Sequence, residues 1–263
     1  MTIKSITSDQ QKQYKRFIED ASNRALKKVN PDKDGLQQLI EKGGEFQNYL
    51  IDGVRRFTAK MPSYGIASMI LGVDFISPEV IVETRMGIVY TKEQLVQFGK
   101  TLPSHEVIEW CRDNNYILVA GPAKPVSLLE IRELESKYFY SKSGSWYANE
   151  KEKFSRNDKV DARWIMLCKK PVANSTSKTW DEQQSTLSKI ESVPNVAEVV
   201  WAITTYKAVR DVYLLPNIYV RTSSLGSDGI HVSVGRFGAD GLVVNDYWDD
   251  YRSSSVGLAS ARK

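Results

Sequence analysis

The chain has 263 residues and a formal net charge of +4 at pH 7, with 41% hydrophobic and 26% charged residues. This composition is typical of a globular protein and excludes a disordered or fibrous chain. The charge is too small to indicate nucleic-acid binding. No apolar run approaches the roughly 18–20 residues of a membrane-spanning helix, and the chain starts without the apolar core of a secretory signal.

These features predict a cytoplasmic protein without a membrane span, although surface display by a route without a secretory signal stays open. The two cysteines, Cys111 and Cys168, are too few for a disulfide framework. They suit a reducing compartment, which agrees with the cytoplasmic expectation.

Residues 1–61 are predicted to form a helical N-terminal segment. Polar helical stretches lie on both sides of a turn at residues 30–35, and the second stretch continues past Phe46 to Val54 with apolar residues at steps of four. The first 60 residues hold 12 Lys and Arg against 8 Asp and Glu, so the whole net charge lies here. We expect an amphipathic arm that offers a contact for a homo-oligomer.

Residues 62–263 are predicted to form one α+β domain. Four helix starts are marked by capping residues: Ser77 before Pro78, Thr91 with Gln94, Ser104, and Ser127. Buried strands are expected at 116–121 and 164–168, and a helix is expected from Asp181 to Ile190. Residues 197–201 are ambiguous between helix and strand, and their β-branched and aromatic content favours a strand.

From Val212 onward the pattern is that of β-structure. Turns at residues 226–229 and 238–241 separate segments in which apolar and polar residues alternate. This alternation places Val232 and Val234 on one face of their strand, and a further strand is expected from Leu242 to Trp248.

The amino-acid usage of this tail is unusual. From Ala208 to Arg262 there is no Lys, Glu, Gln or Met. A β-sheet bias against Lys and Glu explains part of this absence, but it does not explain why Arg and Asp remain. Adaptable recognition surfaces use Ser, Gly, Asn and Tyr in this way.

A genetic explanation is also available. A codon of the form A-A-pyrimidine that is randomised at both adenines encodes Ser, Gly, Asp, Asn, Tyr, His, Ile, Val and Arg among others. It never encodes Lys, Glu, Gln, Met or Trp. Four of these five residue types are missing from the tail, so the lone Trp248 is expected to be a fixed position.

The stretch from Asn217 through Tyr247-Trp-Asp-Asp-Tyr to the Gly-Leu and the basic end resembles the C-terminus of variable proteins of diversity-generating retroelements. In that family a reverse transcriptase rewrites the 3′ end of the gene by adenine mutagenesis. The family has a C-type-lectin fold similar to the formylglycine-generating-enzyme branch. The resemblance covers residues 217–263 well and residues 63–216 less specifically, and it does not cover residues 1–60.

The resemblance implies a C-type-lectin-like domain over residues 62–263, with a short antiparallel sheet, flanking helices and residues 217–263 as the diversified ligand-binding region. Ligands would contact the residues that point off the scaffold. The residues so expected are Gly226, Ile230, His231, Ser233, Arg236, Gly238, Val243, Asn245, Asp246, Tyr247, Asp250, Tyr251, Ser253, Ser254 and Ser255. The expected scaffold residues are Val232, Val234, Leu242, Val244, Trp248 and Leu258.

Metal-binding patterns are weak in this sequence. Residues 30–41 match the spacing of an EF-hand calcium loop, but Asn30 replaces the usual first Asp and Pro31 follows it directly, so a helix-capping turn is favoured. The acidic residues Asp246, Asp249 and Asp250 are interpreted as turn chemistry. We therefore expect no metal and no cofactor.

The function expected from the sequence is ligand binding without catalysis, with Tyr247, Tyr251 and Arg236 as anchors. The partner is a protein or surface ligand specific to this variant. Two alternatives stay open: a formylglycine-generating-type oxidase that uses Cys111 and Cys168, and a phage or prophage structural protein with a fixed partner. Both cysteines are interpreted as buried structural residues.

Overall fold

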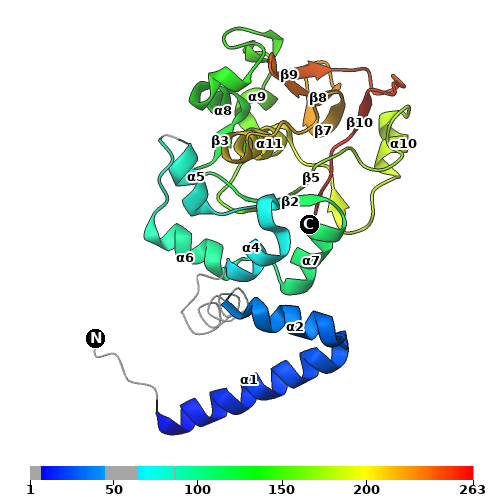
Figure 1. Cartoon of the computed structure of the whole chain (residues 1–263). Coiled ribbons are helices and arrows are strands. Elements are labelled where there is room, and N and C mark those ends of the chain that lie inside the picture. Colours follow the sequence, from blue (N-terminus) through cyan, green and yellow to red (C-terminus); the bar gives the residue numbers. More distant parts are fainter. Residues whose placement is uncertain (1–6, 45–63, 86, 263) are drawn as a thin grey trace. The chain divides into compact units, whose positions relative to one another are not determined.

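The computed structural model describes residues 7–44, 64–85 and 87–262. The chain divides into two compact units, Met1–Met61 and Pro62–Lys263, which Figure 1 draws from blue to red along the sequence. Within the described residues, every helix is too short or too polar to cross a membrane.

The described part of the first unit consists of two helices, α1 (Ser8–Val29) and α2 (Lys33–Glu41). The start of α1 has a capping box between Thr7 and Gln10, and its end is closed by Asn30 in the left-handed conformation. No residue within α1 or α2 is buried. The helical prediction is confirmed for these residues, whereas the predicted continuation from Phe46 to Val54 lies outside the described part of the chain.

Residues 30–41, which have the spacing of an EF-hand calcium loop, contain the start of α2. A side-chain oxygen of Asp32 accepts a hydrogen bond from the backbone N–H of Gly35 at 2.7 Å, so it caps α2. This carboxylate therefore satisfies one of the free N–H groups at the start of the helix, as the capping interpretation requires.

The second unit is a mixed α+β domain. Its helices are α4 (Gly65–Leu71), α5 (Pro78–Thr84), α6 (Lys92–Lys100), α7 (His105–Asp113), α8 (Leu128–Leu134), α9 (Phe154–Asn157), α10 (Trp180–Gln184) and α11 (Val196–Arg210). Its strands are β1 (Phe75–Ile76), β2 (Tyr116–Ala120), β3 (Val126–Ser127), β4 (Lys159–Val160), β5 (Trp164–Cys168), β6 (Glu191–Ser192), β7 (Tyr219–Leu225), β8 (His231–Gly238), β9 (Gly241–Asp246), β10 (Val256–Leu258) and β11 (Ala261–Arg262).

These strands form two main sheets. One has the order β1-β2-β5-β11-β6, the other has the order β10-β7-β8-β9, and β3 pairs with β4. In the second sheet β7, β8 and β9 are antiparallel neighbours, and β10 runs parallel to β7. The end of the chain contributes a strand to each main sheet, because β10 pairs with β7 and β11 pairs with β5 and β6.

The four predicted helix starts are confirmed, although Ser77 stands before Pro78 without a side-chain cap hydrogen bond. Thr91 and Ser127 each form a complete capping box with the residue three positions later, and Ser104 accepts the N–H of Val107. The predicted strands at 116–121 and 164–168 are β2 and β5, which pair with each other in antiparallel register. The helix predicted from Asp181 is shorter than expected, because α10 ends at Gln184.

The strand favoured for residues 197–201 is wrong, because these residues lie inside α11. This helix passes through the middle of the domain in Figure 1 and is buried on nearly all sides from Val196 to Tyr206. Asn195 caps it together with Glu198. The indole N–H of Trp201 donates to the backbone oxygen of Ala120 at 2.9 Å, which ties the helix to β2.

Candidate ligand-binding surface

The sheet β10-β7-β8-β9 carries the tail of the chain. Its inner residues Val232, Val234, Leu242, Val244 and Leu258 are all buried, as predicted for the scaffold. β7 and β8 approach closely at Gly235, where a Cβ atom would lie 2.0 Å from the backbone oxygen of Ile218. Only glycine fits there, so Gly235 allows the close spacing of β7 and β8.

Fourteen of the fifteen expected binding residues are exposed or half-buried. The exception is Ser233, which is fully buried, so the expectation that it points off the scaffold is wrong. Ser233 lies opposite Arg221 of β7 and Asn245 of β9 on the central strand. The chain that follows β9 covers this part of the sheet, because Arg221 bonds to the backbone of Trp248 and Tyr251.

Trp248 was expected to be a scaffold residue, but its side chain is 70% exposed. β9 ends at Asp246, so the strand alternation on which the expectation rested no longer applies at Trp248. The backbone of Trp248 is held, whereas its indole is presented to solvent. We call residues 247–255, which follow β9, the tail loop.

Arg221 holds the tail loop from beneath. Its side chain is fully buried, and one terminal nitrogen donates to the backbone oxygens of Trp248 and Tyr251 at 2.7 and 2.9 Å. The other terminal nitrogen donates to the backbone oxygen of Lys178 and to Oε1 of Gln183. A guanidinium presents its donors in a rigid fork, so it fixes these groups in one geometry.

The electrostatics of Arg221 follow from its position. Burial lowers the pKa of Arg221, and the nearby carboxylates Asp249 and Asp250 act in the opposite direction. The buried amide of Gln183 also donates to the backbone oxygens of Ser175 and Val256. One polar network therefore connects β7, the start of β10, α10 and the tail loop, and its many bonds offset the cost of burying a charge.

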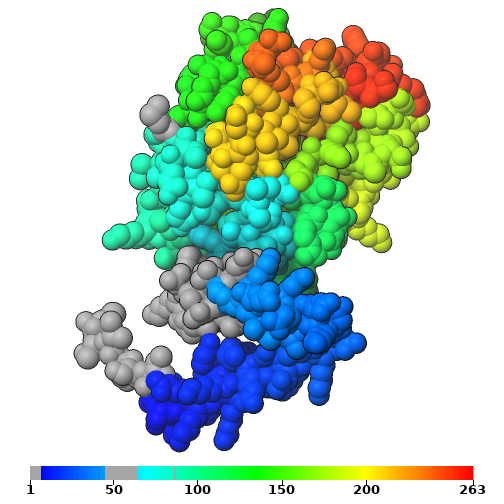
Figure 2. All heavy atoms as spheres, viewed as in Figure 1, coloured from blue at the N-terminus to red at the C-terminus, as the bar shows by residue number. Residues whose placement is uncertain are grey.

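The segment around α10 holds the tail loop from the side. The N–H of Trp180 donates to the backbone oxygen of Asp249 at 2.8 Å, and Ser177 makes the same kind of bond to Ser253. In Figure 2 the tail, orange to red, forms a continuous surface beside the yellow-green α10 segment. The backbone of the loop is therefore fixed although many of its side chains face solvent.

His231 is anchored at the edge of this surface. Its ring stacks on Trp180 with a centroid separation of 3.5 Å and an interplanar angle of 16°. Its Nδ1 lies 2.8 Å from one carboxylate oxygen of Asp249, and the other carboxylate oxygen accepts the backbone N–H of His231 at 3.2 Å. The imidazole therefore has a fixed orientation before any ligand arrives.

Aromatic rings form a row across the tail loop. Tyr219 of β7 packs edge-to-face on Tyr247, and Tyr247 stacks on Tyr251 with ring centroids 5.7 Å apart. Tyr251 is 48% exposed, and the exposed Trp248 lies between the two in sequence. Exposed aromatic rings on a fixed backbone provide contact area at low entropic cost.

The turn between β7 and β8 is also fixed. Ser227 donates to the carboxylate of Glu152 through its N–H at 2.9 Å and its hydroxyl at 2.6 Å. Burial raises the pKa of Asp246, and the charges of Asp228 and Glu152 raise it further. This end of the surface is therefore acidic.

Neither cysteine belongs to the tail loop. Cys111 of α7 is buried, and burial raises the pKa of its thiol to about 12. Burial also raises the pKa of Cys168 in β5. Both are free thiols, and a raised pKa disfavours the thiolate that metal binding or nucleophilic attack requires. In the described part of the chain, no three His, Cys, Asp or Glu side chains gather as a metal site.

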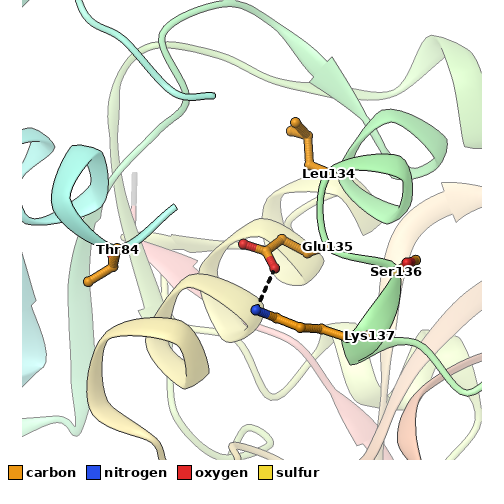
Figure 3. A pocket seen from close by; sticks show the side chains of 5 residues that line it. All are labelled: Thr84, Leu134, Glu135, Ser136 and Lys137. Atoms are coloured by element: carbon orange, nitrogen blue, oxygen red, sulfur yellow. Dashed lines mark ion pairs between the residues drawn. The ribbon is translucent and has the colours of Figure 1, made fainter. Parts of the chain in front are cut away.

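A small hollow of about 240 Å³ lies beside Thr84 and the end of α8. Figure 3 shows Glu135 and Lys137 facing each other across it, with their charged groups 3.4 Å apart. Glu135 also lies 3.6 Å from the buried Arg85, which stacks over Trp201. Glu135 is therefore shared by Arg85 and Lys137, as is typical of a structural ion-pair cluster.

Arg221, Gln183 and Trp180 were not predicted from the sequence as supports of the surface. An Arg inside the apolar strand segment Tyr-Val-Arg-Thr was the one available signal, because a buried charge needs partners. Comparisons of the chain with protein-family models, with curated proteins and with solved structures found no match.

Proposed function

We propose that this protein binds ligands through a C-terminal surface diversified by retroelement adenine mutagenesis and carried on a C-type-lectin-like domain. The exposed or half-buried residues among those expected from the sequence make up this surface, together with Trp248 as a fixed member, because randomised A-A-pyrimidine codons never encode Trp. Its ligand is a protein or surface molecule specific to this variant. The role is binding and not catalysis.

The observation that carries the proposal is that the backbone of the tail loop is held by hydrogen bonds while several of its side chains are exposed. Arg221 and the α10 segment hold the backbone, whereas the side chains of Tyr251, Ser254 and Ser255 are exposed. Side chains at such positions can be exchanged without loss of packing, because surface substitutions usually change stability by less than about 0.5 kcal/mol.

The residue usage supports the same proposal. Lys, Glu, Gln and Met are absent from residues 208–262 in buried and exposed positions alike. An exposed surface normally carries Lys and Glu, so a β-sheet bias does not account for their absence from the tail loop. Randomised A-A-pyrimidine codons do account for it.

The proposal is tested in the DNA that flanks the gene. It predicts a nearby near-copy of the last part of the coding sequence that differs only where the copy has adenine, beside a reverse-transcriptase gene. The differences should fall in codons of residues on the surface, such as the half-buried Ile230 and the exposed Tyr251. Flanking DNA without such a copy would overturn diversification and favour a fixed partner.

A binding test addresses the surface itself once a ligand has been selected from a display library. The triple variant with Ala at Arg236, Tyr247 and Tyr251 should lose binding and keep its fold. Unchanged binding would remove these residues as anchors. A matched control is Tyr140→Ala, because Tyr140 is 68% exposed and lies outside the tail.

A further inference from the structure

A hollow of about 470 Å³ lies between the end of β5 and the segment that joins α11 to β7. This volume falls in the range of about 300–1,000 Å³ that is usual for small-molecule sites. None of the residues that line the hollow belongs to the proposed binding surface. The hollow therefore needs an explanation of its own.

One wall of the hollow is apolar and rigid. Val212, Leu214, Leu215 and Ile218 contribute to it, and Leu214 and Leu215 are buried. Leu215 has a φ of +57°, which is strained for a bulky residue, and its backbone oxygen is held by the N–H of Phe237 at 3.2 Å. The backbone is thus fixed in a costly conformation that keeps this wall in place.

The opposite side of the hollow carries two ammonium groups. Nζ of Lys169 bonds to one carboxylate oxygen of Asp74 at 2.6 Å, and the hydroxyl of Tyr206 donates to the other at 2.9 Å. Burial raises the pKa of Tyr206 to about 12, so this hydroxyl stays protonated and keeps donating to Asp74 at neutral pH. The neighbouring Lys170 is exposed, and among the described residues its ammonium group has no ion-pair partner.

The carboxylates near the hollow are already engaged. Asp74 is shared by Lys169 and Tyr206, and Asp211 pairs with Lys207, which lies over the ring of Tyr213. On the other side of Lys170, Glu191 accepts hydrogen bonds from Tyr116 and Ser260. Because these carboxylates already have partners, the ammonium group of Lys170 is available to bind an anion.

We propose that this hollow binds a small amphipathic anion, with its apolar body against the Leu214–Ile218 wall and its carboxylate at Lys170. This site is independent of the proposed function of the tail, since it shares no residue with that surface. The size of the hollow suits a medium-chain or aromatic carboxylate.

The test uses the full chain with octanoate as the probe and octanamide as its uncharged counterpart. Calorimetry should show one octanoate bound per chain in the millimolar range and weaker binding of octanamide. Methyl NMR should place the largest shifts at Leu214, Leu215 and Ile218. No octanoate binding, equal binding of the two probes, or shifts confined to other methyl groups would overturn the proposal.

Two variants distinguish the contact between Lys170 and the carboxylate of the probe from the contact of its apolar body with the wall. Lys170→Gln should weaken octanoate binding about fivefold, as expected for a partly exposed ion pair, and leave octanamide binding unchanged. Val212→Asp should weaken the binding of both probes, because Val212 lines the hollow and is 48% exposed. Lys124→Gln is the matched control at an exposed lysine. Octanoate affinity that is equal in Lys170→Gln and the control would refute the role of Lys170.

Discussion

Arg221 offers the sharpest test of the fixed tail loop, through the substitution Arg221→Met. Methionine fills similar space but makes none of the four hydrogen bonds of the guanidinium. The backbone oxygens of Trp248 and Tyr251 would lose their buried donor, and so would Oε1 of Gln183.

The size of the effect follows from two opposing contributions. Each hydrogen bond from a charged donor contributes about 1.5–3 kcal/mol, whereas burying the guanidinium costs several kcal/mol. Each buried oxygen that loses its donor costs about 1–3 kcal/mol, so the net loss for the four acceptors, less the removed cost of burying the guanidinium, is about 3–5 kcal/mol. For a domain of this size that corresponds to a fall in Tm of roughly 10 °C.

Thermal unfolding followed by circular dichroism measures the fall in Tm. Hydrogen exchange shows which part of the domain is destabilised. The amides of Ser177, Trp180 and Tyr251 donate to backbone oxygens in the tail loop, so their exchange should accelerate, while the amides of β2 and β5 stay protected. The control is Arg252→Met, because Arg252 is half-exposed and pairs with Glu182. Its effect should be below about 1 kcal/mol. Equal effects of the two substitutions, or unchanged exchange in the loop, would refute the role of Arg221.

Three further predictions concern stability. Gly235→Ala should destabilise the domain by more than about 3 kcal/mol, because a Cβ there meets backbone at 2.0 Å; Gly238→Ala, with open space around it, should be near neutral in a denaturant titration. Burial raises the pKa of Tyr206 to about 12, so its contribution to stability is complete below pH 10 and is lost as pH rises through 12; Tyr206→Phe should flatten this alkaline fall, and an unchanged slope would contradict it. Glu135→Gln should cost about 3 kcal/mol in urea unfolding, because Arg85 would keep its buried charge without its counterion, and a loss below about 1 kcal/mol would contradict that role.

Local signals in the sequence predicted most of the elements. Capping residues such as Thr91 and Ser127 act within one turn of helix, so their effect can be recognised without knowledge of the fold. The strands at 116–121 and 164–168 are buried apolar segments, and both were predicted. The turns at residues 226–229 and 238–241 indicated the two hairpins correctly.

The central helix α11 has the same kind of local signal, the capping box of Asn195 with Glu198, but its hydrophobic pattern does not indicate a helix. A helix at the surface shows an apolar stripe every 3.6 residues, but α11 is buried on nearly all sides and shows no such period. Its Val, Ile and Trp residues then suggested a strand, because β-branched and aromatic residues are common there. Packing between the two sheets, which local sequence does not encode, decides its structure.

The site shows the same limit. Period-2 alternation correctly separated the buried Val232 and Val234 from most of the exposed positions. It was wrong for Ser233, which is covered by a segment distant in sequence, and for Trp248, which lies after the strand ends. The support from Arg221 and Gln183 depends on contacts across 38 residues of chain, which no local pattern reveals.

The measurement that tests the central claim most directly is deep sequencing of the 3′ end of this gene across a cell population. Diversification predicts amino-acid variation at exposed positions such as Tyr251 and Ser254 and at the half-buried Ile230. It predicts no variation at Arg221, whose side chain holds the tail loop, or at Gly235, where only glycine fits. A uniform tail across cells, or variation spread equally over buried and exposed codons, would contradict the account.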